Sequence, residues 1–166
     1  MGLPIDDRTA LLRALLDVQS ASGAEAELAD LIEQTLADCP WLRLHRDGNA
    51  LVAATALGRA SRVIIAGHLD TVPPANNLPS RLITGPQGAV VWGRGAVDMK
   101  GGLAVMLELA STLSRPSRDV SWVFYDGEEI EEQANGLARL ARRHPEWLTG
   151  DFAVLMEPTA TRIEGG

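Results

Sequence analysis

The chain lacks most of the features that mark secreted, membrane-spanning or modified proteins. Its 166 residues contain a single cysteine, Cys39, so no intramolecular disulfide can form and a reducing compartment is expected. The apolar runs are too short to cross a bilayer. Acidic residues among the first leucines argue against a signal or transit peptide. The expected location is therefore the cytoplasm, with no membrane as partner.

Positive charge is also scarce. The chain has 15 Lys and Arg against 22 Asp and Glu, a net charge of −7, and its basic residues form no cluster. Nucleic acid and anionic membranes are therefore not expected partners. Hydrophobic residues make up 46% of the chain, as in soluble globular domains. Part of the acidity lies in residues 126–132, which form either a solvated face or a cation site.

Hydrophobic periodicity predicts two helices and then a hairpin. Leucines recur at helical spacing in residues 7–18. Ser22 and Glu25 match a capping box, so a second helix should begin there and stop before Pro40. Alternating and apolar residues around a turn predict a β-hairpin over residues 42–54.

The rest of the chain alternates between strands and helices. Strands are expected at 62–66, 120–125 and 152–156, and helices at 101–113 and 135–143. Strands separated by helices imply an α/β sheet that is at least partly parallel, and the early hairpin makes it mixed. The predicted fold class is therefore α/β, with a mixed, partly parallel sheet flanked by helices.

Possible metal ligands follow three of the expected strands. His68 and Asp70 come after the first strand, Glu128 and Glu129 after the second, and Glu157 after the third. Ligands of open α/β sheets bind beyond the carboxyl ends of the strands. Parallel strands would therefore bring these side chains to one edge of the sheet.

Asp98 is a further acid, in a Gly-rich loop before a helix, and it could reach the same edge. Each residue alone has a simpler explanation: Asp98 could cap the helix, and Glu128 and Glu129 could be solvated. Their coincidence favours a metal site. One imidazole with several carboxylates and no thiolate suits zinc, cobalt or manganese.

The spacing also suggests different tasks for these residues. His68 and Asp70 point the same way in an extended chain, so Asp70 could accept the ring N–H that does not face the metal. The adjacent Glu128 and Glu129 point differently. One of them could bind metal while the other takes a proton from water.

Four segments, in the same order along the chain, resemble the successive signatures of the dinuclear zinc deacylases and exopeptidases. They are GHLDTVP at 67–73, WGRGAVDMKGG at 92–102, DGEE at 126–129 and MEP at 156–158. This family includes aminoacylase, acetylornithine deacetylase and glutamate carboxypeptidase. Non-catalytic segments are similar to the bacterial succinyl-diaminopimelate desuccinylases within it; they are residues 74–81, 131–137 and 144–154.

The resemblance implies a role for each candidate residue. It implies that His68, Asp98 and Glu157 hold a first zinc ion, that Asp98 bridges to a second, and that Glu129 is a ligand of the second. Cobalt is possible in one site. Glu128 would be the general acid/base, and Asp70 would orient His68. A cis peptide bond is expected between Asp98 and Met99.

The implied activity is amide hydrolysis that releases succinate from N-succinyl-LL-2,6-diaminopimelate, in the lysine and diaminopimelate pathway. A related deacetylase, aminoacylase or dipeptidase is the first alternative, and a non-catalytic metal-binding domain is the second. Residues 1–166 would form the N-terminal part of a zinc-exopeptidase-like catalytic domain.

Family members are more than twice as long as this chain. An inserted dimerisation domain, and the C-terminal half with a closing histidine, would therefore be absent. His45 and His144 are not placed to replace that histidine. The complete enzyme is expected to be a homodimer, and the activity of the truncated chain is left open.

Overall fold

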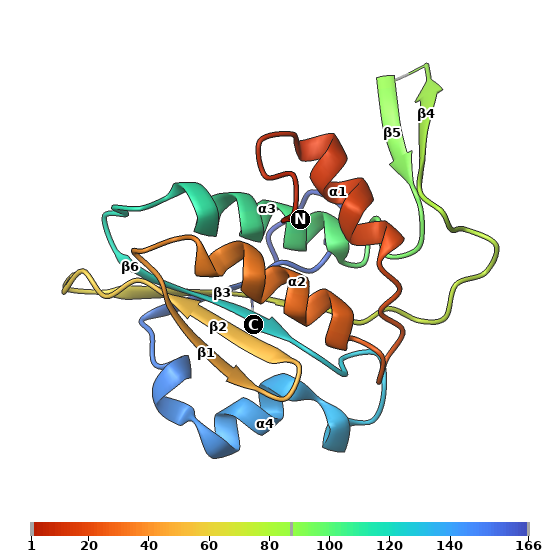
Figure 1. Ribbon diagram of the computed structural model, residues 1–166. Helices are drawn as coiled ribbons and strands as arrows, with labels where there is room; N and C mark the ends of the chain where they lie inside the picture. Colours follow the sequence, from red (N-terminus) through yellow and green to blue (C-terminus); the bar gives the residue numbers. More distant parts are fainter. Residues whose placement is uncertain (1, 87, 166) are drawn as a thin grey trace.

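A five-stranded mixed sheet organises the chain in the computed structural model, which describes residues 2–86 and 88–165. The strand order is β1-β2-β6-β3-β7 (Figure 1). The strands are β1 (Arg43–Asp47), β2 (Ala50–Ala54), β3 (Arg62–His68), β6 (Asp119–Tyr125) and β7 (Phe152–Leu155). β1, β2 and β6 pair antiparallel, whereas β3 pairs parallel with both β6 and β7. The predicted fold class is confirmed.

Helices cover both faces of this sheet (Figure 1). On one face lie α1 (Arg8–Asp17), α2 (Ala26–Ala37) and α3 (Lys100–Thr112), and on the other lie η1 (Glu132–Ala134), α4 (Gly136–Arg143) and η2 (Pro145–Leu148). Side chains of β6 alternate between the two cores: Trp122 and Phe124 pack under α1–α3, and Val123 and Tyr125 pack on the α4 side. β6 is buried on both faces and is therefore the centre of the fold.

The capping box predicted at Ser22 is not formed. Helix α2 begins at Ala26, and Glu25 occupies the N-cap position without a side-chain cap. The Glu25 carboxylate instead accepts a hydrogen bond from the backbone amide of Gly23 at 2.8 Å. The Ser22 hydroxyl donates to the Asp70 carboxylate at 2.7 Å, so it is not available to cap the helix.

A second hairpin, β4 (Arg81–Gly85) and β5 (Gly88–Trp92), projects from the body of the protein (Figure 1). No strand was predicted for these residues from the sequence. Leu82, Ile83 and Val90 are all exposed, so the hairpin has no buried face to impose an alternating pattern on its sequence.

A buried lysine ties the first helix to the loop that carries Asp98. The Lys100 ammonium group donates to the backbone carbonyls of Leu15, at 2.9 Å, and Val18, at 2.8 Å, where α1 ends. Asp98 lies two residues earlier, and the Asp98–Met99 peptide bond is cis, as expected. Across the described residues, none of the helices is both long and apolar enough to span a bilayer.

Candidate metal centre

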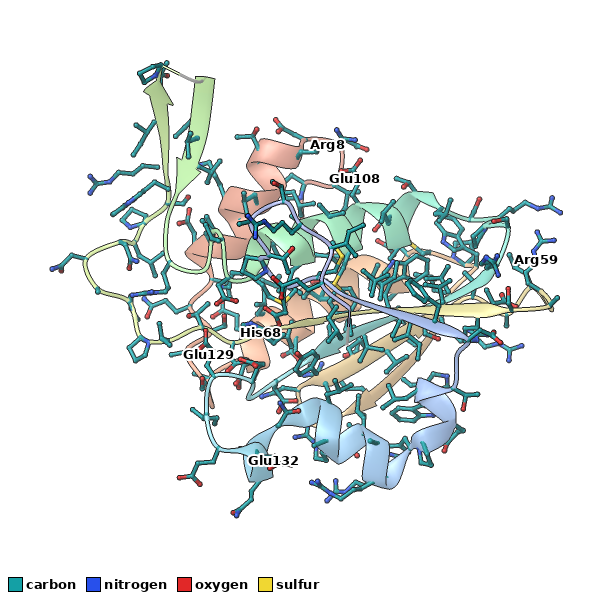
Figure 2. The ribbon with its side chains drawn as sticks, turned by 180° about the vertical axis from the view of Figure 1, so that it is seen from behind. Arg8, Arg59, His68, Glu108, Glu129 and Glu132 are labelled. Atoms are coloured by element: carbon teal, nitrogen blue, oxygen red, sulfur yellow. The ribbon has the colours of Figure 1, made fainter. Side chains whose placement is uncertain are left out.

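The parallel strands deliver the candidate residues to one edge of the sheet. β3 ends at His68, which is in register with Tyr125 at the end of β6, and β7 ends beside them at Leu155. Figure 2 shows His68 and Glu129 together at this edge, with Arg59, which precedes β3, at the opposite end. The predicted convergence at the carboxyl ends of the strands is therefore present.

Three candidate carboxylate ligands gather around one imidazole. The ligand atoms of His68, Asp98 and Glu129 all lie within 4.8 Å of one another. The Nε2 atom of His68 is 3.1 Å from an Asp98 oxygen and 3.8 Å from a Glu157 oxygen. This group of three contains Glu129 rather than Glu157, although Glu157 also approaches His68.

The His68 ring is fixed by a contact that the sequence did not predict. Its Nδ1 atom lies 2.9 Å from the backbone carbonyl of Asp70 and 3.5 Å from the Asp70 carboxylate. The carbonyl oxygen can only accept, so Nδ1 carries the proton and donates to it. The other nitrogen, Nε2, faces Asp98. The carboxylate partner expected from spacing is therefore the more distant neighbour.

The Asp70 carboxylate holds the loop that follows β6. It is fully buried, and it accepts hydrogen bonds at 3.0 Å from the backbone amides of both Glu128 and Glu129. Burial alone would raise the pKa of Asp70. His68, these amides and the Ser22 hydroxyl instead hold that pKa well below its usual range. Asp70 thus stays an anion and organises both sides of the cluster.

The cluster carries an excess of negative charge. Burial raises the pKa of both Glu129 and Glu157, and the repulsion of neighbouring carboxylates adds to this, while His68 opposes it. Burial lowers the pKa of His68, but Asp70, Glu157 and Asp98 outweigh this and raise it to about 9. A positive charge at this edge is therefore favoured, and a divalent cation would relieve the repulsion.

The donor set fits such a cation. One imidazole nitrogen and several carboxylate oxygens within 4.8 Å are ligands that zinc, cobalt and manganese accept. His68 and Asp70 are buried beneath, whereas the Asp98 side chain is 53% exposed and Glu157 35% exposed. The Glu128 residue is also exposed. A ligand can therefore approach the acids from solvent.

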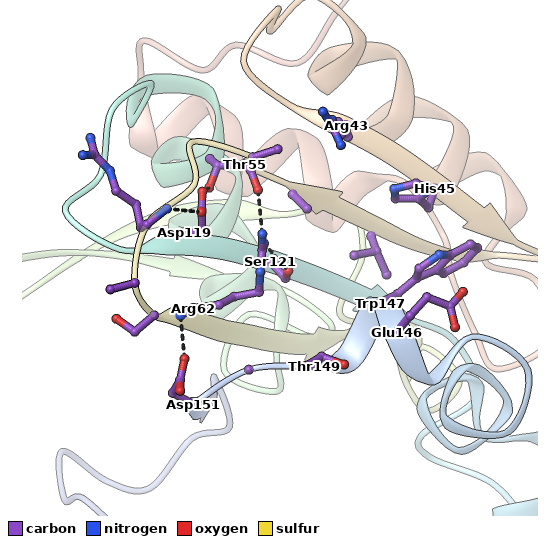
Figure 3. A pocket seen from close by; sticks show the side chains of 17 residues that line it. Arg43, His45, Thr55, Arg62, Asp119, Ser121, Glu146, Trp147, Thr149 and Asp151 are labelled. Atoms are coloured by element: carbon purple, nitrogen blue, oxygen red, sulfur yellow. Dashed lines mark hydrogen bonds between the residues drawn. The ribbon is translucent and has the colours of Figure 1, made fainter.

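A polar hollow of about 420 Å³ lies at the other end of the sheet, between β2 and η2 (Figure 3). Its Arg62 guanidinium donates to the carbonyl of Thr55 and the hydroxyl of Ser121. Asp119 accepts hydrogen bonds from Thr55 and from the loop before β3. The polar groups of this hollow thus bind one another and stabilise the fold. The hollow is separate from the metal centre because it lies at the opposite end of the sheet.

Sequence reasoning missed Ser22 and Tyr125 as neighbours of the centre. The ring of Tyr125 meets that of His68 edge-on, with centroids 6.2 Å apart. Burial and the surrounding acids raise the pKa of the Tyr125 hydroxyl, so it stays protonated. The register of β3 with β6 could have indicated Tyr125, whereas no local pattern links Ser22 to Asp70.

The fold and the edge cluster together define an α/β protein equipped to hold a divalent metal ion. Residues 64–165 match the peptidase family M20/M25/M40, and the chain belongs to this family. The resemblance read from the four sequence signatures is confirmed.

Curated relatives carry desuccinylase names. The chain is 50% identical over 166 residues to a putative succinyl-diaminopimelate desuccinylase of Mycobacterium tuberculosis. This match covers 99% of the chain and 45% of that protein. It is 42% identical over 167 residues to the succinyl-diaminopimelate desuccinylase of Corynebacterium glutamicum, covering 98% of this chain and 44% of that protein. The chain thus spans less than half the length of these relatives.

Solved structures share the fold. A tripeptidase from Staphylococcus aureus superposes with a TM-score of 0.72 at 22% identity, covering 95% of this chain and 44% of that one. Human carnosine dipeptidase 1 gives a TM-score of 0.71 at 17% identity, covering 91% of this chain and 38% of that one. At these identities the likeness establishes architecture alone.

Proposed function

We propose that this chain forms part of a zinc-dependent amide hydrolase that releases succinate from N-succinyl-LL-2,6-diaminopimelate. The convergence of His68, Asp98 and Glu129 within 4.8 Å carries the proposal. The substrate rests on the 50% identity to a protein named as a putative succinyl-diaminopimelate desuccinylase.

His68, Asp98 and Glu157 would hold one zinc ion, and Asp98 and Glu129 would contribute to a second. The contacts of His68 Nε2 with both Asp98 and Glu157 support the first set, and the proximity of Glu129 to Asp98 supports the second. Bound zinc supplies Lewis acidity that polarises an amide carbonyl and makes water easier to deprotonate. Cobalt is an alternative in one site.

Glu128 is proposed as the general acid/base. Its backbone amide is held by Asp70 at 3.0 Å, while the residue itself is exposed. The backbone is thus fixed and the carboxylate is free to meet a substrate. Glu128 would take a proton from the attacking water and return it to the departing amine, so that the amide bond breaks without a charged leaving group.

We further propose that residues 1–166 form the N-terminal part of the catalytic domain, with an inserted dimerisation domain and a C-terminal half elsewhere in a homodimeric enzyme. The chain's 45% share of its relative supports this. So do Phe152 and Leu155, which are 64% and 58% exposed on β7 at the edge of the sheet. The proposed location is the cytoplasm, in keeping with the free thiol of Cys39.

The test is hydrolysis by the longer protein that contains this chain, with zinc, on N-succinyl-LL-2,6-diaminopimelate and N-acetylornithine. We expect the succinyl substrate to have the higher kcat/KM. Faster deacetylation would assign the protein to a related deacylase. Zinc binding with no hydrolysis of either compound, or of dipeptides, would support a non-catalytic metal-binding domain.

A further inference from the structure

The loop between α1 and α2 reaches the metal centre through one hydroxyl group. The Oγ atom of Ser22 donates to Oδ2 of Asp70 at 2.7 Å, across 48 residues of sequence. We propose that Ser22 is a positioning residue, whose hydroxyl sets the orientation of the Asp70 carboxylate and, through it, of His68 and the Glu128–Glu129 backbone. This inference rests on the proposed metal-dependent function of that centre.

Backbone contacts hold Ser22 in place before its side chain acts. Ala21 and Thr71 form a short parallel bridge. Within it, the Thr71 amide donates to the Ser20 carbonyl at 2.9 Å, and the Ser22 amide donates to the Thr71 carbonyl at 3.2 Å. The loop thus runs beside the segment that carries Asp70. Because the backbone of Ser22 is already held, its hydroxyl loses little conformational entropy when it binds the carboxylate.

The two carboxylate oxygens of Asp70 have different hydrogen-bond partners. Oδ1 accepts from the Glu128 amide and lies 3.5 Å from His68 Nδ1, whereas Oδ2 accepts from the Glu129 amide and from Ser22. The terminal torsion of an aspartate is broad, so the carboxylate turns unless donors restrain it. Ser22 is the side-chain donor to Oδ2. Without it, that oxygen retains only the Glu129 amide among the partners given by the described residues.

A turn of the Asp70 carboxylate would act on both sides of the centre at once. Its oxygens bind the amides of Glu128 and Glu129, and Oδ1 lies close to the His68 ring. Asp70 is fully buried, so water cannot readily replace a lost donor. Loss of the Ser22 hydroxyl should therefore loosen the Glu128–Glu129 loop and weaken the hold on a metal ion.

A purely structural role would be to fasten the loop, and Ser20 provides a matched control. Its hydroxyl is buried and donates to the carbonyl of Leu69 at 2.8 Å, and among the described residues it makes no hydrogen bond to Asp70. Ser20→Ala removes a hydroxyl from the same loop without touching the carboxylate. In a second pair, Ser22→Thr and Ser22→Val, the two new side chains have nearly the same volume as each other, and only threonine carries a hydroxyl.

The experiment compares these variants of the 166-residue chain by amide hydrogen exchange without metal and by titration with zinc. In Ser22→Ala and Ser22→Val we expect the Glu128 and Glu129 amides to exchange about tenfold faster, and zinc to bind about tenfold more weakly. Ser22→Thr and Ser20→Ala should behave as the unaltered chain in both measurements, even if Ser20→Ala melts at a lower temperature.

Equal exchange and equal zinc affinity in Ser22→Val and Ser22→Thr would overturn the positioning role. Parallel losses in Ser22→Ala and Ser20→Ala would do the same, because they would show that the loop alone matters. An unaltered chain that binds no zinc would count against the proposed function instead. The exchange rates of Glu128 and Glu129 would then still decide the role of Ser22.

Discussion

His68 and Asp98 face each other across the edge of the sheet, with Nε2 of the histidine 3.1 Å from a carboxylate oxygen, although 30 residues separate them in the chain. The pair can offer a metal ion one imidazole nitrogen, once Nε2 has lost its proton, and one carboxylate oxygen. Glu157 also lies close to this nitrogen, with an oxygen 3.8 Å from Nε2.

Zinc titration of the chain should find at most one tight site. His68, Asp98 and Glu157 can provide three ligands, with water as a fourth. The described residues offer a second site two ligands, Asp98 and Glu129, so it should be weak. Isothermal calorimetry would measure the stoichiometry, and His68→Ala should abolish the tight site. Two equally tight ions would show that a ligand has been overlooked.

Glu128→Gln in the proposed full-length enzyme should separate proton transfer from metal binding. Turnover should fall roughly 10²–10⁴-fold, the usual effect of losing a general acid/base, while the metal content stays the same. Glu129→Gln, next to it in the chain, is the comparison and should lower occupancy of the second metal. Metal loss in Glu128→Gln, with full activity per bound ion, would exchange the two roles.

Asp119 should make the fold sensitive to acid. The residue is buried, and although burial raises its pKa, the amides of Leu57 and Arg59 and the hydroxyl of Thr55 hold that pKa below its usual range. Because the folded-state pKa is lowered, the stabilisation is fully present above about pH 4 and is lost as the pH falls toward the folded-state value.

Asp119→Asn should therefore be less stable by about 2 kcal/mol at pH 7, because the amide group cannot accept from both backbone donors. Urea unfolding at several pH values should show this deficit shrinking below about pH 4. Asp38→Asn removes a charge from an exposed position and is the control. A deficit that is independent of pH would contradict the assignment.

Arg139 should be a stability centre for the turn between β1 and β2. Its guanidinium donates to the Asp47 carboxylate at 3.0 Å and to the Asp126 carboxylate at 2.7 Å. The Arg139 side chain is 20% exposed, so water screens these contacts only in part. Arg139→Met should lower the free energy of unfolding by about 2 kcal/mol, measured by denaturant unfolding. Arg142→Met, on the same helix but exposed, should change it by less than about 0.5 kcal/mol.

The position of the candidate centre could be predicted from the sequence because it follows from where the strands lie and from their parallel direction. Apolar runs give the strands, and strands joined by helices are parallel, so residues that follow β3, β6 and β7 must meet at one edge. The roles assigned to individual acids came from family resemblance and stay predictions. They depend on contacts that spacing alone does not determine.

Two kinds of feature could not be predicted from the sequence. One is a contact between distant segments, and the other is an element that has no buried face. Ser22 and Glu25 satisfy a local capping rule, but a carboxylate 48 residues away competes for the serine hydroxyl. The Asp70 carbonyl, rather than its side chain, is nearest to His68, because backbone direction decides that contact. The β4–β5 hairpin is exposed on both faces and so left no periodic signal.

Through Lys100, the N-terminal helix α1 helps to hold the loop that carries Asp98. Lys100 is the first residue of α3 and lies two positions after Asp98. Its ammonium group binds the carbonyls of Leu15 and Val18 at the end of α1. Strain applied to the amino end, by a bulky fusion partner or by proteolytic trimming of α1, would therefore be transmitted to the Asp98 loop. Expression strategies for this protein should leave α1 intact and carry any tag on a flexible spacer.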